Sequence, residues 1–118
     1  MVYNRTMKTV NLEAGHPDVS TAKIRLYNSI YSSRAQGAKD IKVIHGYGSS
    51  GTGGAIRKAC LSELASYKKR GIIKDFCPGD KFGPMWQEGR DIVSRYPRLR
   101  SDSDWARSND GITVVVLK

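Results

Sequence analysis

Hydrophobic positions along the first half of the chain repeat at strand spacing, then at helix spacing, then at strand spacing again. Partial alternation and β-prone residues predict a strand over residues 6–12. Steps of three and four residues predict an amphipathic helix over residues 18–36, with Pro17 at its start and Gly37 at its end. A short β-branched run predicts a second strand over residues 40–45.

The second half continues the alternation and closes on the most apolar strand of the chain. A second helix is predicted over residues 53–70 and a third strand over residues 72–77. Residues 78–109 show no strong period, although residues 87–96 have the pattern of a short helix. The last strand, residues 111–117, is a continuous apolar run, which is typical of a central strand covered on both faces.

This order of elements predicts an α/β (α+β) fold with a four-stranded mixed sheet and helices on one or both of its faces. A chain of 118 residues has the length of one domain, so we expect a single domain over residues 1–118. Hydrophobic residues make up 39% of the chain and charged residues 26%, as in ordinary globular proteins.

The charge balance narrows the class of partner. Twenty Lys and Arg residues stand against eleven Asp and Glu residues, giving a net charge of +9. Such an excess favours polyanions, because each neutralised phosphate releases condensed counterions. A generic basic surface that keeps the protein in solution is the alternative interpretation.

The cysteines and the apolar segments indicate the cellular compartment of the protein. Cys60 and Cys77 form no C-x-x-C pair, and with two histidines they do not suffice for a zinc site, so we expect buried thiols. The sequence shows no signal peptide and no apolar run long enough for a membrane span, which predicts a cytoplasmic protein without a membrane partner.

The glycine-rich segment between the second strand and the second helix carries the most chemical information. It begins at His45-Gly46-Tyr47-Gly48 and continues with glycines to Gly54. Glycines permit positive φ and close approach, and bare amides beside a helix N-terminus attract anions. Arg57 and Lys58 lie one turn into the helix and would add full charges. The pattern therefore predicts phosphate contacts here; a flexible connector is the alternative.

Two nucleotide-binding motifs can be compared with this segment. Gly46-Tyr47-Gly48-Ser49-Ser50-Gly51 matches G-x-G-x-x-G, but the chain lacks room for paired mononucleotide halves, and Asp75 lies in mid-strand rather than at a strand end. The phosphate-binding loop of ATPases is excluded, since Gly54 stands in place of its lysine. A small enzyme that binds a nucleotide on the glycine-rich turn remains the alternative function.

The order of motifs resembles the Smr (small MutS-related) domain family. The residues that carry the resemblance are Val10-Asn11-Leu12-Glu13 at the end of the first strand, His45-Gly46-Tyr47-Gly48 after the second, Ile56-Arg57-Lys58-Ala59 in the second helix, and Gly111-Ile112-Thr113-Val114-Val115-Val116-Leu117 at the end. H-G-x-G after a strand is the most specific of them. The stretch over residues 78–109 is longer than the corresponding connection in that family.

The resemblance implies a β-α-β-α-β-β two-layer sandwich similar to the C-terminal domain of a translation initiation factor, here with an extra helix or loop segment before the last strand. It also implies DNA or RNA binding, and in many members a nicking or RNA-cleaving endonuclease linked to repair, recombination or the ribosome. It does not decide between DNA and RNA, and the oligomeric state is left open.

The sequence departs from the family at the expected catalytic positions. The family's L-D-x-H motif supplies an Asp and a His, whereas this chain has Asn11 and Glu13, with His16 after a short insertion. Glu13 and His45 are the candidate acid–base residues, and Arg57 the candidate for phosphate charge. The resemblance implies no particular cofactor, and a requirement for Mg²⁺ or Mn²⁺ is left open.

Basic and aromatic residues are interleaved in the segment before the last strand. The arginines of residues 90–107 are expected to be exposed, in a pattern that suits contact with nucleic acid. Trp86 and Trp105 are expected instead to pin the segment to the core.

Overall fold

The computed structural model describes residues 7–46 and 51–118, and it contains the strands and helices that the sequence predicts. The order is β1 (Lys8–Asn11), α1 (Val19–Ala35), β2 (Asp40–Ile44), α2 (Gly51–Lys69), β3 (Ile73–Pro78), η1 (Gly79–Lys81), α3 (Gln87–Arg95), η2 (Pro97–Ser101) and β4 (Ile112–Leu117). One difference concerns the stretch after α3, which was expected to be a loop and instead begins with the 3₁₀ turn η2.

The four strands form one mixed sheet in the order β1-β2-β4-β3. Strand β1 pairs with β2 in parallel, and β4 runs antiparallel to both of its neighbours. Every residue of β4 is buried, so the apolar run at the end of the chain is a central strand, as predicted. The predicted four-stranded mixed sheet is confirmed.

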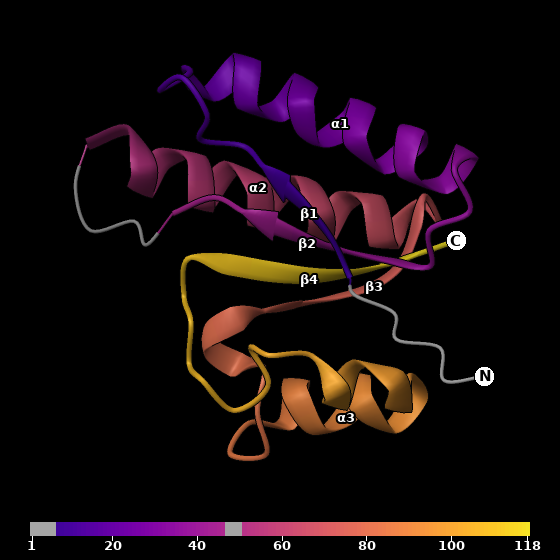
Figure 1. Ribbon diagram of the computed structural model, residues 1–118. Coiled ribbons are helices and arrows are strands. Elements are labelled where there is room, and N and C mark those ends of the chain that lie inside the picture. The colour runs from indigo at the N-terminus through magenta and orange to yellow at the C-terminus, as the bar shows by residue number, and fades with distance from the viewer. Residues whose placement is uncertain (1–6, 47–50) are drawn as a thin grey trace.

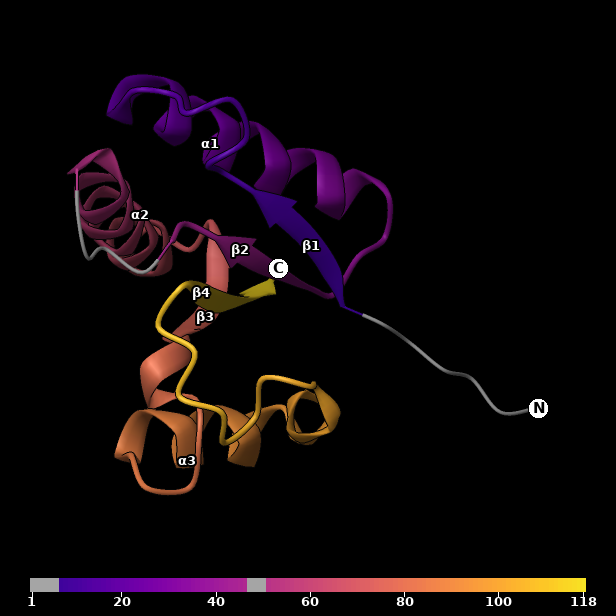
Figure 2. The same ribbon diagram turned by 60° about the vertical axis from the view of Figure 1, so that its left-hand side comes forward.

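Helices α1 and α2 lie side by side on one face of the sheet (Figures 1 and 2). Asp18 caps α1 by accepting a 2.8 Å hydrogen bond from the Thr21 amide. The core under the two helices is formed by alternate residues of the strands and by the apolar stripes of the helices. Its fully buried members include Leu26, Ile30, Ile41, Val43, Leu64 and Val115.

The segment between β3 and β4 covers the opposite face of the sheet and makes a third layer (Figures 1 and 2). Its core includes Phe82, Ile92, Val93 and Leu99 against Val114 and Val116. Trp105 packs edge-on against Phe82, with ring centroids 5.1 Å apart, so this tryptophan pins the segment as predicted. Trp86 does not, because 47% of it is exposed.

Ion pairs fasten this third layer to β2. Lys42 Nζ lies 2.7 Å from an oxygen of Asp102 and 2.6 Å from an oxygen of Asp104. Arg98 makes two 2.7 Å hydrogen bonds to the Asp40 carboxylate. Burial lowers the pKa of Lys42, but its hydrogen bonds to Asp102 and Asp104 outweigh burial and raise that pKa overall. The polar residues of β2 therefore anchor the extra segment.

The two cysteines lie in different cores. Cys60, on α2, is buried in the core under the helices, and Cys77, on β3, is buried in the core of the third layer. Burial is the main reason why the pKa of each thiol is raised to about 12. The expectation of buried free thiols is confirmed. In the described part of the chain, no helix has the length and apolar character to cross a membrane.

Candidate nucleic-acid interface

The candidate residues lie close together at the carboxyl ends of β1 and β2 because of the strand directions. Strands β1 and β2 are parallel, so Glu13 and His45, which follow them, leave the sheet at the same edge. Strand β4 is antiparallel and begins at that edge, next to Gly111. The main chain confirms the proximity, since the Leu12 amide donates to the Ile44 carbonyl over 2.9 Å.

The Glu13 carboxylate lies directly against Gly46. A methyl group on Gly46 would overlap the Glu13 side chain, and the backbone of Gly46 has φ +84°, which favours glycine. Asn11 orients the turn, because its side-chain oxygen accepts a 2.8 Å hydrogen bond from the Glu13 amide. The structure therefore brings together the end of the first-strand motif and Gly46 of the H-G-x-G motif, with Glu13 half-buried beside that glycine.

His45 lies inside the protein and not on the candidate surface. Its exposed fraction is 0%. Nδ1 is 2.9 Å from the Gly46 carbonyl oxygen, which can only accept, so Nδ1 carries the proton. In the neutral ring Nε2 then accepts from the Thr113 hydroxyl over 2.8 Å. Burial is the largest of the influences that lower the pKa of His45, and nearby Arg57 lowers it further.

The expectation that His45 acts as a catalytic acid or base on a substrate stays a prediction, and this geometry does not support it. The ring is enclosed and both nitrogens have partners, so in this structure it cannot reach a phosphate. A histidine at a strand end looks solvent-accessible from the sequence; what buries it is a hydrogen bond to a strand 68 residues further along the chain. His45 instead ties the end of β2 to β4.

The expected phosphate contacts of the His45 and Gly46 backbone also stay a prediction, because both amides already have partners in this structure. Both amides donate to the carbonyl oxygen of Gly111, at 3.0 and 3.1 Å. Neither is a free donor for an anion. Tyr47 and Gly48, the other expected contacts of the turn, lie outside the described residues.

Arg57 and Lys58 occupy adjacent positions on α2 but differ in their surroundings. The Arg57 guanidinium is half-buried; it donates to the Asp110 carbonyl over 3.2 Å and lies 3.4 Å from Asp80. Arg57 therefore fastens α2 to the turns that flank β3 and β4. Lys58 is exposed, and no ion pair involves it among residues 7–46 and 51–118.

His16 does not restore the missing motif histidine by direct contact. It is exposed in the turn before α1, with φ +50°, and its amide donates to the Glu13 carbonyl over 3.0 Å. In the described part of the chain, no hydrogen bond or ion pair joins its ring to Glu13, His45 or Arg57.

Three further residues complete the site but were missed from the sequence. Asp80 and Asp110 meet Arg57, and Thr113 meets His45. Thr113 had a detectable signal, since it is the one polar side chain in the apolar run of β4. The two aspartates had none, because their proximity depends on the layout of the third layer.

Side chains that bind metals do not form a cluster among the described residues. Between residues 7 and 46 and from 51 onwards, no group of three His, Cys, Asp or Glu side chains lies close enough to hold one. Glu13 faces glycine, and Asp80 is paired with a guanidinium.

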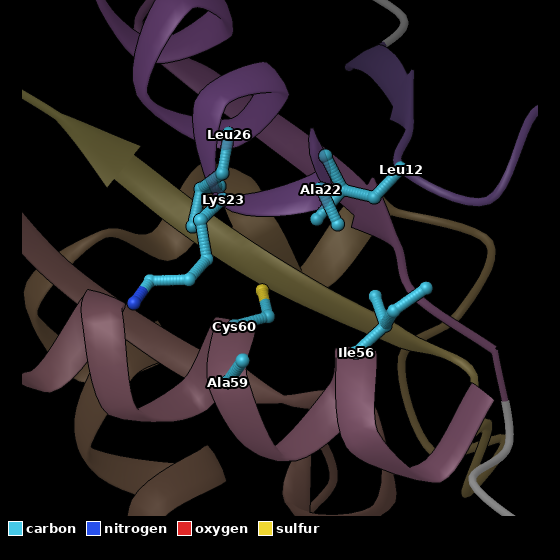
Figure 3. Close-up of a pocket in the computed structure, with 7 residues that line it drawn as sticks. All are labelled: Leu12, Ala22, Lys23, Leu26, Ile56, Ala59 and Cys60. Carbon is cyan, nitrogen blue, oxygen red and sulfur yellow. The ribbon is translucent and has the colours of Figure 1, made fainter. Parts of the chain in front are cut away.

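The apolar gap between α1 and α2 is not a substrate site (Figure 3). Its empty volume is about 150 Å³, whereas ligand pockets typically measure ~300–1,000 Å³. Its lining is apolar apart from Lys23, whose side chain extends from α1 toward α2 and pairs with Glu63. The lining residues are Leu12, Ala22, Lys23, Leu26, Ile56, Ala59 and Cys60.

Comparisons with known proteins give one clear similarity. No protein-family model matches the chain, and a search of curated proteins finds no match. Among solved structures, the chain is similar to the Smr domain of Thermus thermophilus MutS2, with a TM-score of 0.53 and 19% sequence identity over 97% of this chain and 99% of that one. The helices and the four-stranded mixed sheet agree with the resemblance seen in the sequence. The chain has the fold of an Smr domain.

Proposed function

We propose that this protein binds nucleic acid, with the corner formed by Glu13, Gly46 and the first turns of α2 as its main contact. The observation that carries the proposal is the distribution of charge. Seven of the eleven acidic side chains are paired with seven cations inside the molecule. The net charge of +9 therefore resides on cations without a carboxylate partner in those pairs, which are available to phosphates.

Lys58 offers the cleanest test of this proposal. Its side chain is exposed at the corner, so Lys58→Ala removes a charge without breaking an ion pair among the described residues. We expect weaker binding to labelled branched DNA and structured RNA, with the slope of log affinity against log salt reduced by about 1. Fluorescence anisotropy over a salt series measures both quantities.

Lys74→Ala is the matched control. Lys74 is an exposed lysine on β3, away from the corner. For Lys74→Ala we expect the slope of log affinity against log salt to stay at the wild-type value. Equal slopes for wild type, Lys58→Ala and Lys74→Ala would contradict binding at the corner.

We also propose, as a second function of the same corner, phosphodiester cleavage with Glu13 as the general base. The position of its carboxylate against Gly46, at the carboxyl ends of β1 and β2, supports this role. A carboxylate there can accept a proton from a water whose oxygen bonds to phosphorus. The P–O bond to the departing strand breaks, and its oxygen takes a proton from solvent, while the exposed Lys58 adds positive charge at the corner. His45 serves as a positioning residue through Gly46 and Thr113.

Glu13→Gln tests cleavage separately from binding. Glutamine keeps the shape of the side chain, and the hydrogen bond from the residue 13 amide to Asn11 is unaffected. We expect nicking of labelled branched DNA or RNA, assayed with and without Mg²⁺ or Mn²⁺, to fall by at least about 100-fold, while affinity is retained. Nicking by Glu13→Gln at the wild-type rate would exclude Glu13 as the base. If the wild-type protein leaves the substrate intact, the protein binds nucleic acid without cleaving it.

The alternative, a small enzyme that binds a nucleotide on the glycine-rich turn, stays a prediction. Tyr47–Ser50 of that turn lie outside the described residues, and the gap between α1 and α2 is too small for a nucleotide. Calorimetric titration with ATP and with NAD tests it directly, and the absence of binding heat would end it.

A further inference from the structure

A row of neighbouring aromatic and arginine side chains crosses α1 and the end of α2, with all but one of its members at least partly exposed. The Arg34 guanidinium lies 5.5 Å from the ring centroid of Tyr31, and the rings of Tyr31 and Tyr27 are 4.8 Å apart. The ring of Tyr27 is 6.3 Å from that of Tyr67, and the Arg70 guanidinium lies 6.0 Å from Tyr67. We call these five residues the tyrosine–arginine row.

The middle of the row is exposed in a way that the core does not require. Tyr27 is 46% exposed and Tyr31 is 40% exposed, whereas Tyr67 is 4% exposed and forms the floor of the row. The buried stripe of α1 is supplied by other residues, Ala22, Leu26 and Ile30. Two half-exposed tyrosine rings one turn apart on a surface helix are therefore left with faces that a partner could cover.

The charges around the row are positive. Among residues 7–46 and 51–118, no ion pair involves Arg34, Lys69 or Arg70. Glu63, the carboxylate next to Tyr67, is already 3.1 Å from Lys23. Cations at the C-terminal ends of helices complement the macrodipole, which accounts for some of these positions but not for the exposed tyrosines.

The row is separate from the corner described above. It occupies the C-terminal halves of α1 and α2, whereas the corner lies at the N-terminal end of α2 (Figure 1). No residue is shared between them, so variants can address each surface alone.

We propose that the tyrosine–arginine row is a second nucleic-acid contact that binds an unpaired strand, with bases stacked on Tyr27 and Tyr31 and phosphates held by Arg34 and Arg70. Single strands offer free base faces to aromatic rings and a flexible backbone to flanking cations. A duplex keeps its bases stacked internally and cannot use the rings. The proposal rests on the proposed function only in that both partners are polynucleotides.

A protein partner is the competing occupant. Tyrosine and arginine are also common at the centres of protein interfaces, and Ile24, 61% exposed, extends the apolar surface by one turn. The charge decides for the polyanion: both ends of the row are arginines without a carboxylate partner in the described residues, on a molecule of net charge +9.

The double variant Tyr27→Ala/Tyr31→Ala tests the proposal with the whole chain. By fluorescence anisotropy with labelled oligo(dT) and oligo(U), we expect a loss of affinity of about tenfold or more, since stacking one base on a ring contributes a factor of about ten. Affinity for a duplex of the same length should not change. Tyr27→Phe/Tyr31→Phe keeps the rings and should bind oligo(dT) and oligo(U) as wild type does.

Trp86→Ala is the matched control, because Trp86 is also a half-exposed ring beside a cation, Lys81, but lies on the opposite layer. It should leave affinity for the single strand unchanged. An equal loss in Trp86→Ala, or no loss in the double alanine variant, overturns the proposal. So does loss of self-association in sedimentation with unchanged strand affinity, because the row would then contact protein. Circular dichroism melting checks that each variant is folded.

The two nucleic-acid proposals fail in different ways. Lys58→Ala could leave the affinity for branched DNA or structured RNA unchanged while the double tyrosine variant loses affinity for oligo(dT). The proposal for the corner is then wrong, and the proposal for the tyrosine–arginine row is supported. If the tyrosine variant binds oligo(dT) normally while Lys58→Ala lowers the salt slope, the row is wrong and the corner stands.

Discussion

Gly46 is the residue where backbone conformation and side-chain packing restrict the chain at the same position. Its φ of +84° disfavours any residue with a Cβ, and the Glu13 carboxylate occupies the space that a Cβ would need. Gly37 provides a comparison, because it has the same φ of +84° with nothing within 4 Å of the added carbon. Alanine substitutions at Gly46 and Gly37 therefore separate the free-energy cost of the positive φ from the cost of steric overlap with Glu13.

We expect Gly46→Ala to lower the free energy of unfolding by about 2–4 kcal/mol, and Gly37→Ala by only ~1 kcal/mol. Urea unfolding measures both. In a Glu13→Ala background, the cost of Gly46→Ala should fall toward that of Gly37→Ala, since the overlap is gone. Equal costs of Gly46→Ala in both backgrounds would show that Glu13 does not press against this glycine.

His45 makes stability depend on pH at mildly acidic values. Its pKa is lowered in the folded protein, mainly by burial, so the unfolded chain, with its ordinary pKa near 6.5, takes up the proton first. The contribution of His45 is fully present above pH 6.5 and is lost as the pH falls toward the lowered pKa of the folded state. The window therefore opens at about pH 6.5 and extends below it, down to the lowered pKa of the folded state.

We expect the free energy of unfolding to decrease from pH 7.5 to pH 5.5, and His45→Gln to decrease less over the same interval. NMR titration of the ring gives the pKa directly, and a value above 6.5 would contradict the buried neutral ring.

Among the elements, β2 has two distinct faces. Its odd-numbered residues pack under α1 and α2, whereas Asp40 and Lys42 face the third layer and hold it through ion pairs. The Lys42 side chain is 12% exposed and sits between two carboxylates. Its removal leaves both without their cation in a partly buried position.

Lys42→Met should therefore lower the free energy of unfolding by about 2–3 kcal/mol. Lys23→Met is the control: Lys23 also forms an ion pair, with Glu63, but its side chain is 47% exposed, so less than ~1 kcal/mol is expected. Thermal unfolding of both variants measures the difference. Similar losses would mean that the third layer does not depend on this cluster.

The elements were largely predictable, whereas the contacts between them were not. Apolar periodicity placed α1, α2, α3 and the central β4, because burial of one face leaves a pattern in local sequence. The 3₁₀ turn at Pro97–Ser101 has too few apolar positions to leave one. At the site, the meeting of Glu13 with Gly46 was implied by the motif order, but the burial of His45 under Thr113 depends on register across the sheet.

At the scale of the whole molecule, one sheet separates two cores. Strand β4 contributes Val115 and Leu117 to the core under the helices, and Val114 and Val116 to the core of the third layer. Because a single strand belongs to both, loss of one core should disrupt the other. The protein is then expected to unfold in one transition.

Ile92→Ala tests this coupling, since Ile92 is 1% exposed in the third layer. We expect the free energy of unfolding to fall by about 2–5 kcal/mol. Tryptophan fluorescence, which includes Trp105, reports on the third layer, whereas far-ultraviolet circular dichroism is dominated by the helices. The unfolding midpoints measured by the two methods should shift equally. Separate midpoints would show that the third layer opens alone.

The placement of Cys60 and Cys77 in different cores turns the native thiols into two independent chemical reporters. With pKa values of about 12, hardly any thiolate forms at neutral pH, and an alkylating reagent can react only after the surrounding core opens. Mass spectrometry of the modified peptides would then measure how often the core on each side of the sheet opens, without any engineered label.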